Sequence, residues 1–160
     1  MEQWKNNLTA EDGELTTKYF SKFFKREITI VFMDTEDKIQ PKQTELVNKI
    51  ISQEHQWIED VLKSLVNYYK EGYSDYKDGW EMGGTDEATI EEYLPKEMDR
   101  EKLLTLITPA DICIFPEESC DDGSFGFTLD CTWDDEHGLG VNFSNWKITD
   151  VGGVDVAFIY

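Results

Sequence analysis

Apolar and polar residues alternate with a period of two in the last third of the chain, and this pattern indicates β-strands with one buried face. Every second residue from Phe125 to Trp133 is apolar, and the alternation resumes between Leu139 and Phe143. A five-residue loop over Asp134–Gly138 would join these two strands with apolar residues opposite each other. The predicted pairs are Trp133 with Leu139, Cys131 with Val141, and Leu129 with Phe143.

A third strand continues the same pattern. If Ser144 and Asn145 form a two-residue turn, Phe143 lies opposite Trp146 on the buried face, and Val141 lies opposite Ile148. We therefore predict an antiparallel meander of three strands. Apolar residues also recur at every second position of Val154–Tyr160, where we expect the last strand of the chain.

The N-terminal part of the chain predicts a second strand pair. Glu27–Met33 is rich in β-branched and apolar residues and reads as a strand, and Tyr19–Phe23 is its expected hairpin partner, with a turn near Lys25 and Arg26. A further strand is expected at Asp111–Phe115, where Pro116 follows it. Residues 1–17 are mostly polar, and we expect them to form a loosely held lead-in.

The middle of the chain has helical periodicity instead. Pro41 is a favourable first helical residue, and apolar residues then recur at spacings of three and four through residues 46–51 and 57–69. The polar interruption at residues 54–56 leaves open whether this segment is one long helix or two. Gly72 is the expected stop, because glycine tolerates the left-handed conformation that ends many helices.

Residues 73–95 are rich in glycine and acids and predict an irregular acidic loop with a short turn of helix near Thr89–Tyr93. A short helix is expected over Asp99–Ile107, because Pro109 prevents its continuation. The whole chain, residues 1–160, has the length of a single domain. The predicted class is α+β: a mostly antiparallel sheet, built from the N-terminal hairpin and the C-terminal meander, with helices packed on one face.

The net charge of −19 changes the functional expectations more than any other compositional feature. Residues 1–70 carry 12 acidic and 10 basic residues, whereas residues 71–160 carry 22 acidic and 5 basic residues. Such a field repels nucleic acid and anionic lipid, so we expect neither as a partner; it attracts a basic protein. The alternative is that the acids only keep the domain dissolved.

Other features of the composition set the expected environment. The chain has no apolar run long enough to span a membrane, and its first residues lack the order of a secretory signal. Its three cysteines are too few and too scattered for a disulfide framework or a zinc site. We expect a cytoplasmic protein without a cofactor.

The segment Asp134–Gly138 is the first candidate for chemistry. Asp134, Glu136 and His137 could bind a divalent cation, or His137 could act as a general base oriented by a carboxylate. The structural alternative is a hydrated hairpin loop, and we favour it. Cys131 is an unfavourable nucleophile for His137, because the predicted register points its thiol into the apolar face.

Residues 73–95 provide the second candidate. Trp80 and Tyr76 stand among acids such as Asp78 and Glu81. Aromatic side chains surrounded by charged residues are typical of protein-binding surfaces. Equally, these rings could cover the ends of the helices. We predict that Trp80, Asp78, Glu81 and Tyr76 contact a partner.

Two segments near the C-terminus resemble the hallmark of an uncharacterised bacterial domain family, which reads Cys-x-Trp-Asp-x-Glu-His-Gly-Leu-Gly-Val followed by Val-Gly-x-x-Asp-x-Ala-Phe. The matching residues of the first segment are Cys131, Trp133, Asp134, Glu136, His137, Gly138, Leu139, Gly140 and Val141. Those of the second are Val151, Gly152, Asp155, Ala157 and Phe158. The resemblance implies no particular activity; in size and acidity these proteins are similar to immunity proteins of bacterial toxin systems.

Two functional hypotheses follow from these observations, beside the plainer possibility of a structural subunit of a larger assembly. The first is a non-catalytic acidic module that binds a basic protein, such as an immunity protein that neutralises a bacterial toxin domain. The second is a metal-dependent or acid–base enzyme centred on residues 134–137.

Overall fold

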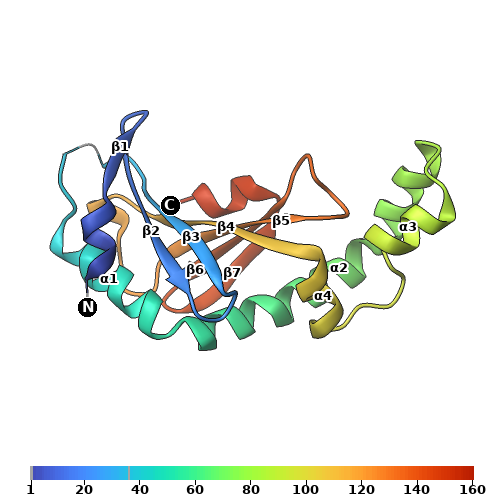
Figure 1. Cartoon of the computed structure of the whole chain (residues 1–160), viewed down its shortest axis with the longest axis horizontal. Helices are drawn as coiled ribbons and strands as arrows, with labels where there is room; N and C mark the ends of the chain where they lie inside the picture. The colour runs from blue at the N-terminus through green and yellow to red at the C-terminus, as the bar shows by residue number, and fades with distance from the viewer. Residues whose placement is uncertain (1, 36) are drawn as a thin grey trace.

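The computed structural model describes residues 2–35 and 37–160, and over these residues the strands form one seven-stranded sheet with a row of helices along one face (Figure 1). The strand order equals the chain order, and every neighbouring pair is antiparallel except the parallel pair β3–β4. The α+β class with a mostly antiparallel sheet is therefore confirmed. The strands are β1 (Thr9–Glu11), β2 (Glu14–Ser21), β3 (Arg26–Phe32), β4 (Ile107–Ile114), β5 (Phe125–Cys131), β6 (Leu139–Ser144) and β7 (Lys147–Gly152).

The α-helices lie between β3 and β4 in the sequence. The α-helices are α1 (Pro41–Ser52), α2 (Glu54–Met82), α3 (Glu87–Tyr93) and α4 (Arg100–Leu106), and the short 3-10 helices are η1 (Gln3–Asn7), η2 (Glu117–Ser119) and η3 (Val154–Phe158). Within the described ranges, no helix combines the length and the apolar character needed to cross a membrane.

The core lies between α2 and the sheet. Trp57 of α2 packs edge-on against Phe125, Phe127 and Phe143, with ring centroids 5.5, 5.1 and 6.0 Å away. These phenylalanines are fully or almost fully buried. Burying each such ring stabilises the fold by about 1.5–3 kcal/mol, so the alternating residues of β5 and β6 account for much of the attachment of the helix layer.

The C-terminal segment covers the opposite face of the sheet. A Cβ atom at Gly126 would lie 1.9 Å from the carbonyl oxygen of Ala157, and one at Gly140 would lie 2.3 Å from the carbonyl oxygen of Gly153. Only glycine permits this approach. The Asn142 side chain also donates to the carbonyl of Val156 at 2.9 Å. The prediction of a strand at Val154–Tyr160 is wrong, because this segment packs flat on the sheet as η3 instead of extending it.

The predicted meander is present, but its register differs. The observed pairs are Leu129 with Leu139, Phe127 with Val141, and Phe125 with Phe143, which differs by four residues from the predicted pairing. A shift by an even number keeps the same side chains on the buried face. The following turn consists of Asn145 and Trp146, both at positive φ, rather than Ser144 and Asn145. A bulge at Thr149 then separates the paired residues Ile148 and Asp150.

The N-terminal hairpin of β2 and β3 is confirmed, with Lys25 at positive φ in its turn. The prediction that residues 1–17 form a loosely held lead-in is wrong for the described part, residues 2–17. Trp4 is buried, stacks on Phe32 with centroids 5.9 Å apart, and donates from Nε1 to the Asn48 side chain at 3.0 Å. The Asp12-Gly13 turn then joins β1 to β2.

The helical segment consists of two helices separated at Gln53. Glu54, buried at the start of α2, accepts hydrogen bonds from the backbone N–H groups of Lys22 and Phe23 at 2.7 and 3.1 Å, and from the Tyr19 hydroxyl at 3.1 Å. The carboxylate thus fixes the β2–β3 turn to the helix layer.

The predicted stop at Gly72 is wrong, and so is the irregular loop predicted directly after it, because helix α2 continues through Gly72 to Met82. The short turn of helix predicted near Thr89–Tyr93 is confirmed as α3 (Glu87–Tyr93). Tyr69, Tyr76 and Trp80 recur at helical spacing on the face of α2 that packs inward. A glycine inside a helix costs only about 1 kcal/mol, and burial of this aromatic stripe outweighs that cost.

The predicted helix over Asp99–Ile107 is confirmed as α4. The Asp99 side chain accepts from the backbone N–H of Lys102 and begins the helix. Strand β4 follows at once and includes Pro109, where its pairing with β5 is irregular.

Candidate functional site: the acidic arm and the loop beside it

The end of α2 and the helix α3 extend past the sheet at one end of the molecule (Figure 1). We call residues 71–95 the arm. It carries eight acidic residues and one basic residue, Lys77, and all eight acidic side chains are exposed. Lys77 is itself paired with Glu81 at 3.7 Å. The arm therefore presents a strongly negative surface.

Two exposed apolar side chains accompany these carboxylates. Met82 is 89% exposed at the last position of α2, and Tyr93 is 40% exposed at the end of α3. Single exposed apolar residues are common, but these two stand on an element whose remaining exposed positions are mostly acidic. The arm thus combines apolar anchors with charge, as protein-binding surfaces do.

The predicted contact residues fall into two groups. Asp78 and Glu81 are exposed on the arm. Trp80 and Tyr76 are half-buried and have partners within the chain: Trp80 donates from Nε1 to the carbonyl of Trp133 at 3.1 Å and packs against Tyr93. These two rings attach the arm to the β5–β6 connection, so the surface they offer to a partner is limited.

Tyr76 lies against the buried Trp133. Burial, together with the Tyr68 hydroxyl at 3.4 Å, raises the pKa of Tyr76. The indole N–H of Trp133 lies near enough to the Tyr76 hydroxyl to oppose part of that rise, yet it completes no hydrogen bond with any described residue. Trp133 also packs edge-on against Tyr69 at 4.8 Å. This aromatic cluster forms the base of the arm.

A hollow of about 450 Å³ lies between α2 and α3. Its apolar lining comes from Tyr73, Ala88 and Ile90, and its charged lining from Lys77 and the carboxylates of Glu81, Glu87 and Glu91. Ile90 is buried at the contact between the helices. The two helices therefore make part of the acidic surface concave.

The loop between β5 and β6 contains the first sequence candidate. His137 Nδ1 lies 3.0 Å from Asp134 Oδ1, and the same carboxylate accepts from the His137 backbone N–H at 3.1 Å. The hydrogen bond with Asp134, and its charge, raise the pKa of the exposed His137. Within residues 2–35 and 37–160, no three His, Cys, Asp or Glu side chains are placed to hold a metal ion. The loop therefore contains an oriented Asp134–His137 pair without a preformed metal centre.

The cysteines are free thiols, and all three are buried. Burial raises the pKa of Cys131 to about 12, and its thiol donates to the carbonyl of Asp134 at 3.5 Å. A thiol in this state is a poor nucleophile.

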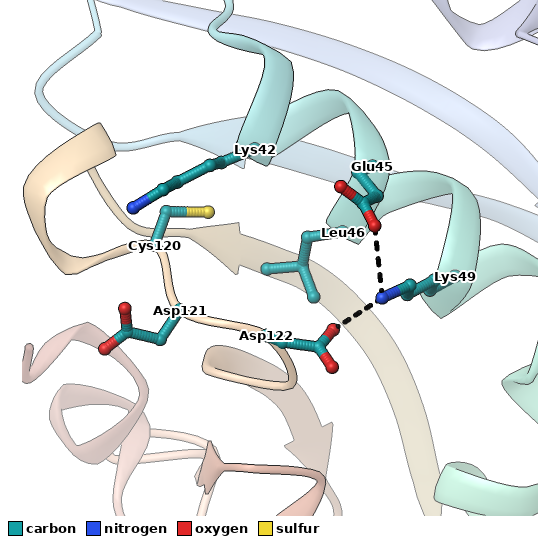
Figure 2. A pocket seen from close by; sticks show the side chains of 7 residues that line it. All are labelled: Lys42, Glu45, Leu46, Lys49, Cys120, Asp121 and Asp122. Carbon is teal, nitrogen blue, oxygen red and sulfur yellow. Dashed lines mark hydrogen bonds and ion pairs between the residues drawn. The ribbon is translucent and has the colours of Figure 1, made fainter.

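Cys120 lines a separate hollow of about 200 Å³ between α1 and the connection from β4 to β5 (Figure 2). Figure 2 shows the Lys49 ammonium between the carboxylates of Glu45 and Asp122, at 3.3 and 3.0 Å. Burial raises the pKa of Cys120 to about 11. The hollow has an ion pair and a protonated thiol, which is a structural arrangement rather than a reactive one.

A family model described as "Domain of unknown function (DUF6985)" matches residues 4–158. The chain belongs to this family. No curated protein and no solved structure matched the chain. The DUF6985 match includes the arm as well as the two C-terminal segments singled out in the sequence.

The structure brings those two segments of this DUF6985 chain into contact. The Val154 backbone N–H donates to the carbonyl of His137 at 2.9 Å, and Gly138, at positive φ, lies under the Val154 side chain. The loop carrying Asp134 and His137 thus rests on the start of η3. Sequence reasoning missed this contact and the continuation of α2 into the arm; the aromatic spacing from Tyr69 to Trp80 was the available signal for the latter.

Proposed function

We propose that this chain is a non-catalytic binding module for a basic protein domain, and that it acts as an immunity protein that neutralises a bacterial toxin of basic charge. The observation that carries the proposal is the arm, where eight exposed acidic side chains and one paired lysine project beyond the sheet. Complementary charge accelerates encounter and selects partners. A cytoplasmic location is part of this proposal, because it keeps the three thiols reduced.

In this proposal some residues of the arm contact the partner and others hold the arm in position. Asp78 and Glu81 provide negative charge at the contact, and Met82 provides an apolar anchor at the tip. Trp80 and Tyr76 keep the end of α2 in place through Trp133, so that the charged residues are held before the partner arrives. Such preorganisation reduces the entropy lost on binding.

The test uses the purified chain and the basic protein encoded beside it in its genome. Isothermal titration at low and high salt should give an affinity that falls as salt rises. The double variant D78K/E81K should weaken binding about tenfold or more. The control E117K/E118K makes the same charge change on the distant η2 and should alter affinity far less, because its residues lie outside the arm.

Two outcomes would contradict the proposal. One is the absence of binding to a basic neighbour at low salt. The other is equal weakening by both double variants, which would show that net charge alone, rather than the arm, is responsible for the attraction.

The second candidate is a metal-dependent or acid–base enzyme centred on Asp134, Glu136 and His137. The hydrogen bond between Asp134 and His137 favours it, since a carboxylate that orients an imidazole is a common catalytic pair. Calorimetric titration with calcium, magnesium, manganese and zinc tests the metal version. Heat of binding that disappears in His137→Gln would support it, and no heat with any of the four ions would remove it.

A further inference from the structure

The sheet has an open edge at the opposite part of the fold, along β2. Strand β1 pairs only with residues Glu14–Thr16 of β2, from Glu11 opposite Glu14 to Thr9 opposite Thr16. Strand β2 continues to Ser21 and pairs with β3 on its other side over its remaining length. Among the described residues, no strand lies beside the outer edge of β2 after Thr16.

The direction of the backbone groups along this edge follows from the turns. Asp12 and Gly13, both at positive φ, form a two-residue hairpin turn, which is closed by a hydrogen-bonded pair at Glu11 and Glu14. The even-numbered residues of β2 therefore direct their N–H and C=O groups outward. The Met33 N–H donates to the Ile114 carbonyl at 2.8 Å, so the backbone groups of odd-numbered residues in β3 face β4. The even-numbered residues of β3 then face β2, where they pair with odd-numbered residues, which agrees with outward groups at the even positions of β2.

Lys18 and Phe20 are thus left with outward backbone groups for which the described chain supplies no hydrogen-bond partner. Unpaired groups on an edge strand are a template for one further strand. The Phe20 side chain is 62% exposed on the same stretch. Protein sheets often protect such an edge with proline, a bulge or charged side chains; this stretch of β2 has no proline and no bulge, and Lys18 is the charged side chain on it.

A cleft follows the edge and gives a second strand room. Gln3, Trp4 and Asn7 of η1 form its far wall, and the hollow between them and Lys18–Phe20 measures about 510 Å³. Ile51 contributes to its lining from α1 and also to that of an adjoining hollow of about 380 Å³, beside Phe23 and His55. The edge is therefore open to a chain, and the cleft has apolar lining at Trp4, Tyr19, Phe20 and Ile51 beside polar lining at Gln3, Asn7, Lys18 and Glu27.

The charge here is opposite to that of the arm. Residues 18–27 contain four basic residues and one acidic residue, in a chain whose net charge is −19. The basic side chains Lys18, Lys22, Lys25 and Arg26 are all exposed. An acidic segment would be attracted to this edge, whereas a second copy of the chain pairing through its own β2 edge would bring like charges together.

We propose that the outer edge of β2 binds an extended peptide segment in which acidic and apolar residues alternate, as an added strand beside Lys18–Phe20. Its backbone pairs with Lys18 and Phe20. Its apolar side chains enter the hollow at Trp4 and Ile51, and its acidic side chains meet Lys18 and Lys22. This surface is separate from the arm, so that the two can be tested and can fail independently.

The test uses the full chain labelled with nitrogen-15 and an acetylated hexapeptide of alternating glutamate and valine. In nuclear magnetic resonance spectra, the peptide should shift the amide signals of Lys18 and Phe20 and slow their hydrogen exchange. The control peptide has the same side chains but N-methyl groups on its central amides, so that neither of its edges can donate. It should bind at least tenfold more weakly.

A pair of protein variants tests the backbone contribution. Phe20→Pro removes the outward N–H and leaves the ladder with β3 intact, because that N–H takes no part in it; Phe20→Ala removes the ring but keeps the N–H. We expect Phe20→Pro to abolish peptide binding and Phe20→Ala to weaken it a few-fold. If Phe20→Pro fails to fold, the two peptides alone decide the question.

Several results would overturn this inference. They are amide shifts confined to other regions, equal affinity for the methylated and unmethylated peptides, or equal affinity of folded Phe20→Pro and Phe20→Ala. Protection of the Lys18 and Phe20 amides without peptide, together with a dimer in sedimentation, would assign the edge to a second copy and would likewise overturn the peptide proposal.

Discussion

The C-terminal meander and the arm use the same kinds of residue in opposite ways. In β5 and β6 the aromatic side chains are buried against α2, and the opposite face is so close to η3 that glycine is required at two positions. In the arm the carboxylates are exposed, and only a few side chains, such as Ile90 and Leu94, are buried. The meander is packed on both faces and the arm on one. Substitutions in the meander should therefore lower the stability of the whole fold, whereas substitutions in the arm should change the arm alone.

The largest expected effect is at Gly126. A methyl group there would occupy the position of the Ala157 carbonyl oxygen, only 1.9 Å away, and backbone cannot move aside cheaply. We expect Gly126→Ala to lower the free energy of unfolding by about 3 kcal/mol or more, measured by urea denaturation. A loss below about 1 kcal/mol would mean that η3 is not held against this face.

The next largest effect is expected at Trp80, the contact between the two regions. Trp80→Ala removes the hydrogen bond to the Trp133 carbonyl and the packing against Tyr93. Hydrogen exchange should show the arm opening more easily, by about 1–2 kcal/mol, while the amides of β5 and β6 keep their protection. Equal loss of protection in both regions would show that the arm and the meander unfold as one unit.

A smaller effect of opposite sign is expected within the arm at Gly79. No atom outside the residue's immediate surroundings lies within 4 Å of a Cβ placed there, and the residue is inside α2. Gly79→Ala should stabilise the helix by about 0.5–1 kcal/mol. The same chemical change thus has opposite consequences at Gly126 and Gly79, and thermal melting of both variants compares them directly.

The smallest effect concerns the pH dependence of the β5–β6 loop. Asp134 raises the pKa of His137 in the folded protein. The stability that this pair adds is therefore complete below the ordinary histidine pKa of about 6.5, and it is lost as the pH rises through the raised pKa of folded His137. Asp134→Asn should lower the pKa of His137 in a proton NMR titration. Its destabilisation should be greater at about pH 5.5 than at about pH 8.5. An unchanged His137 pKa would contradict the pairing.

Much of the fold could be predicted from the sequence where burial has a simple period. The alternation from Phe125 to Phe143 placed two strands and their buried face, even though the register differed by four residues, because an even shift leaves that face unchanged. Loop length is not encoded in the alternation, so the pattern does not reveal the longer interval between the paired residues Leu129 and Leu139.

The errors arose where tertiary contacts override local signals. Gly72 favours a helix stop, yet the aromatic stripe of α2 continues past it. The alternation in residues 154–158 indicates a strand, but the segment packs as a 3-10 helix against Gly126 and Gly140, which the alternation does not show. For the site, Asp78 and Glu81 are exposed and their contact with a partner stays a prediction, whereas the internal partners of Tyr76 and Trp80 depend on Trp133, distant in sequence.

The order of the strands has a consequence for how the chain can vary. Because each strand lies beside its neighbour in sequence, β3–β4 is the one pairing in the described sheet that must wait for a long connection, residues 33–106, to close. Loop-closure entropy rises only with the logarithm of length, so that doubling a flexible connection costs about 0.6 kcal/mol. The helices α1 to α4 lie within that connection. In evolution the arm can therefore change in length or charge with little loss of stability. The sheet then stays the same while the surface for recognition changes.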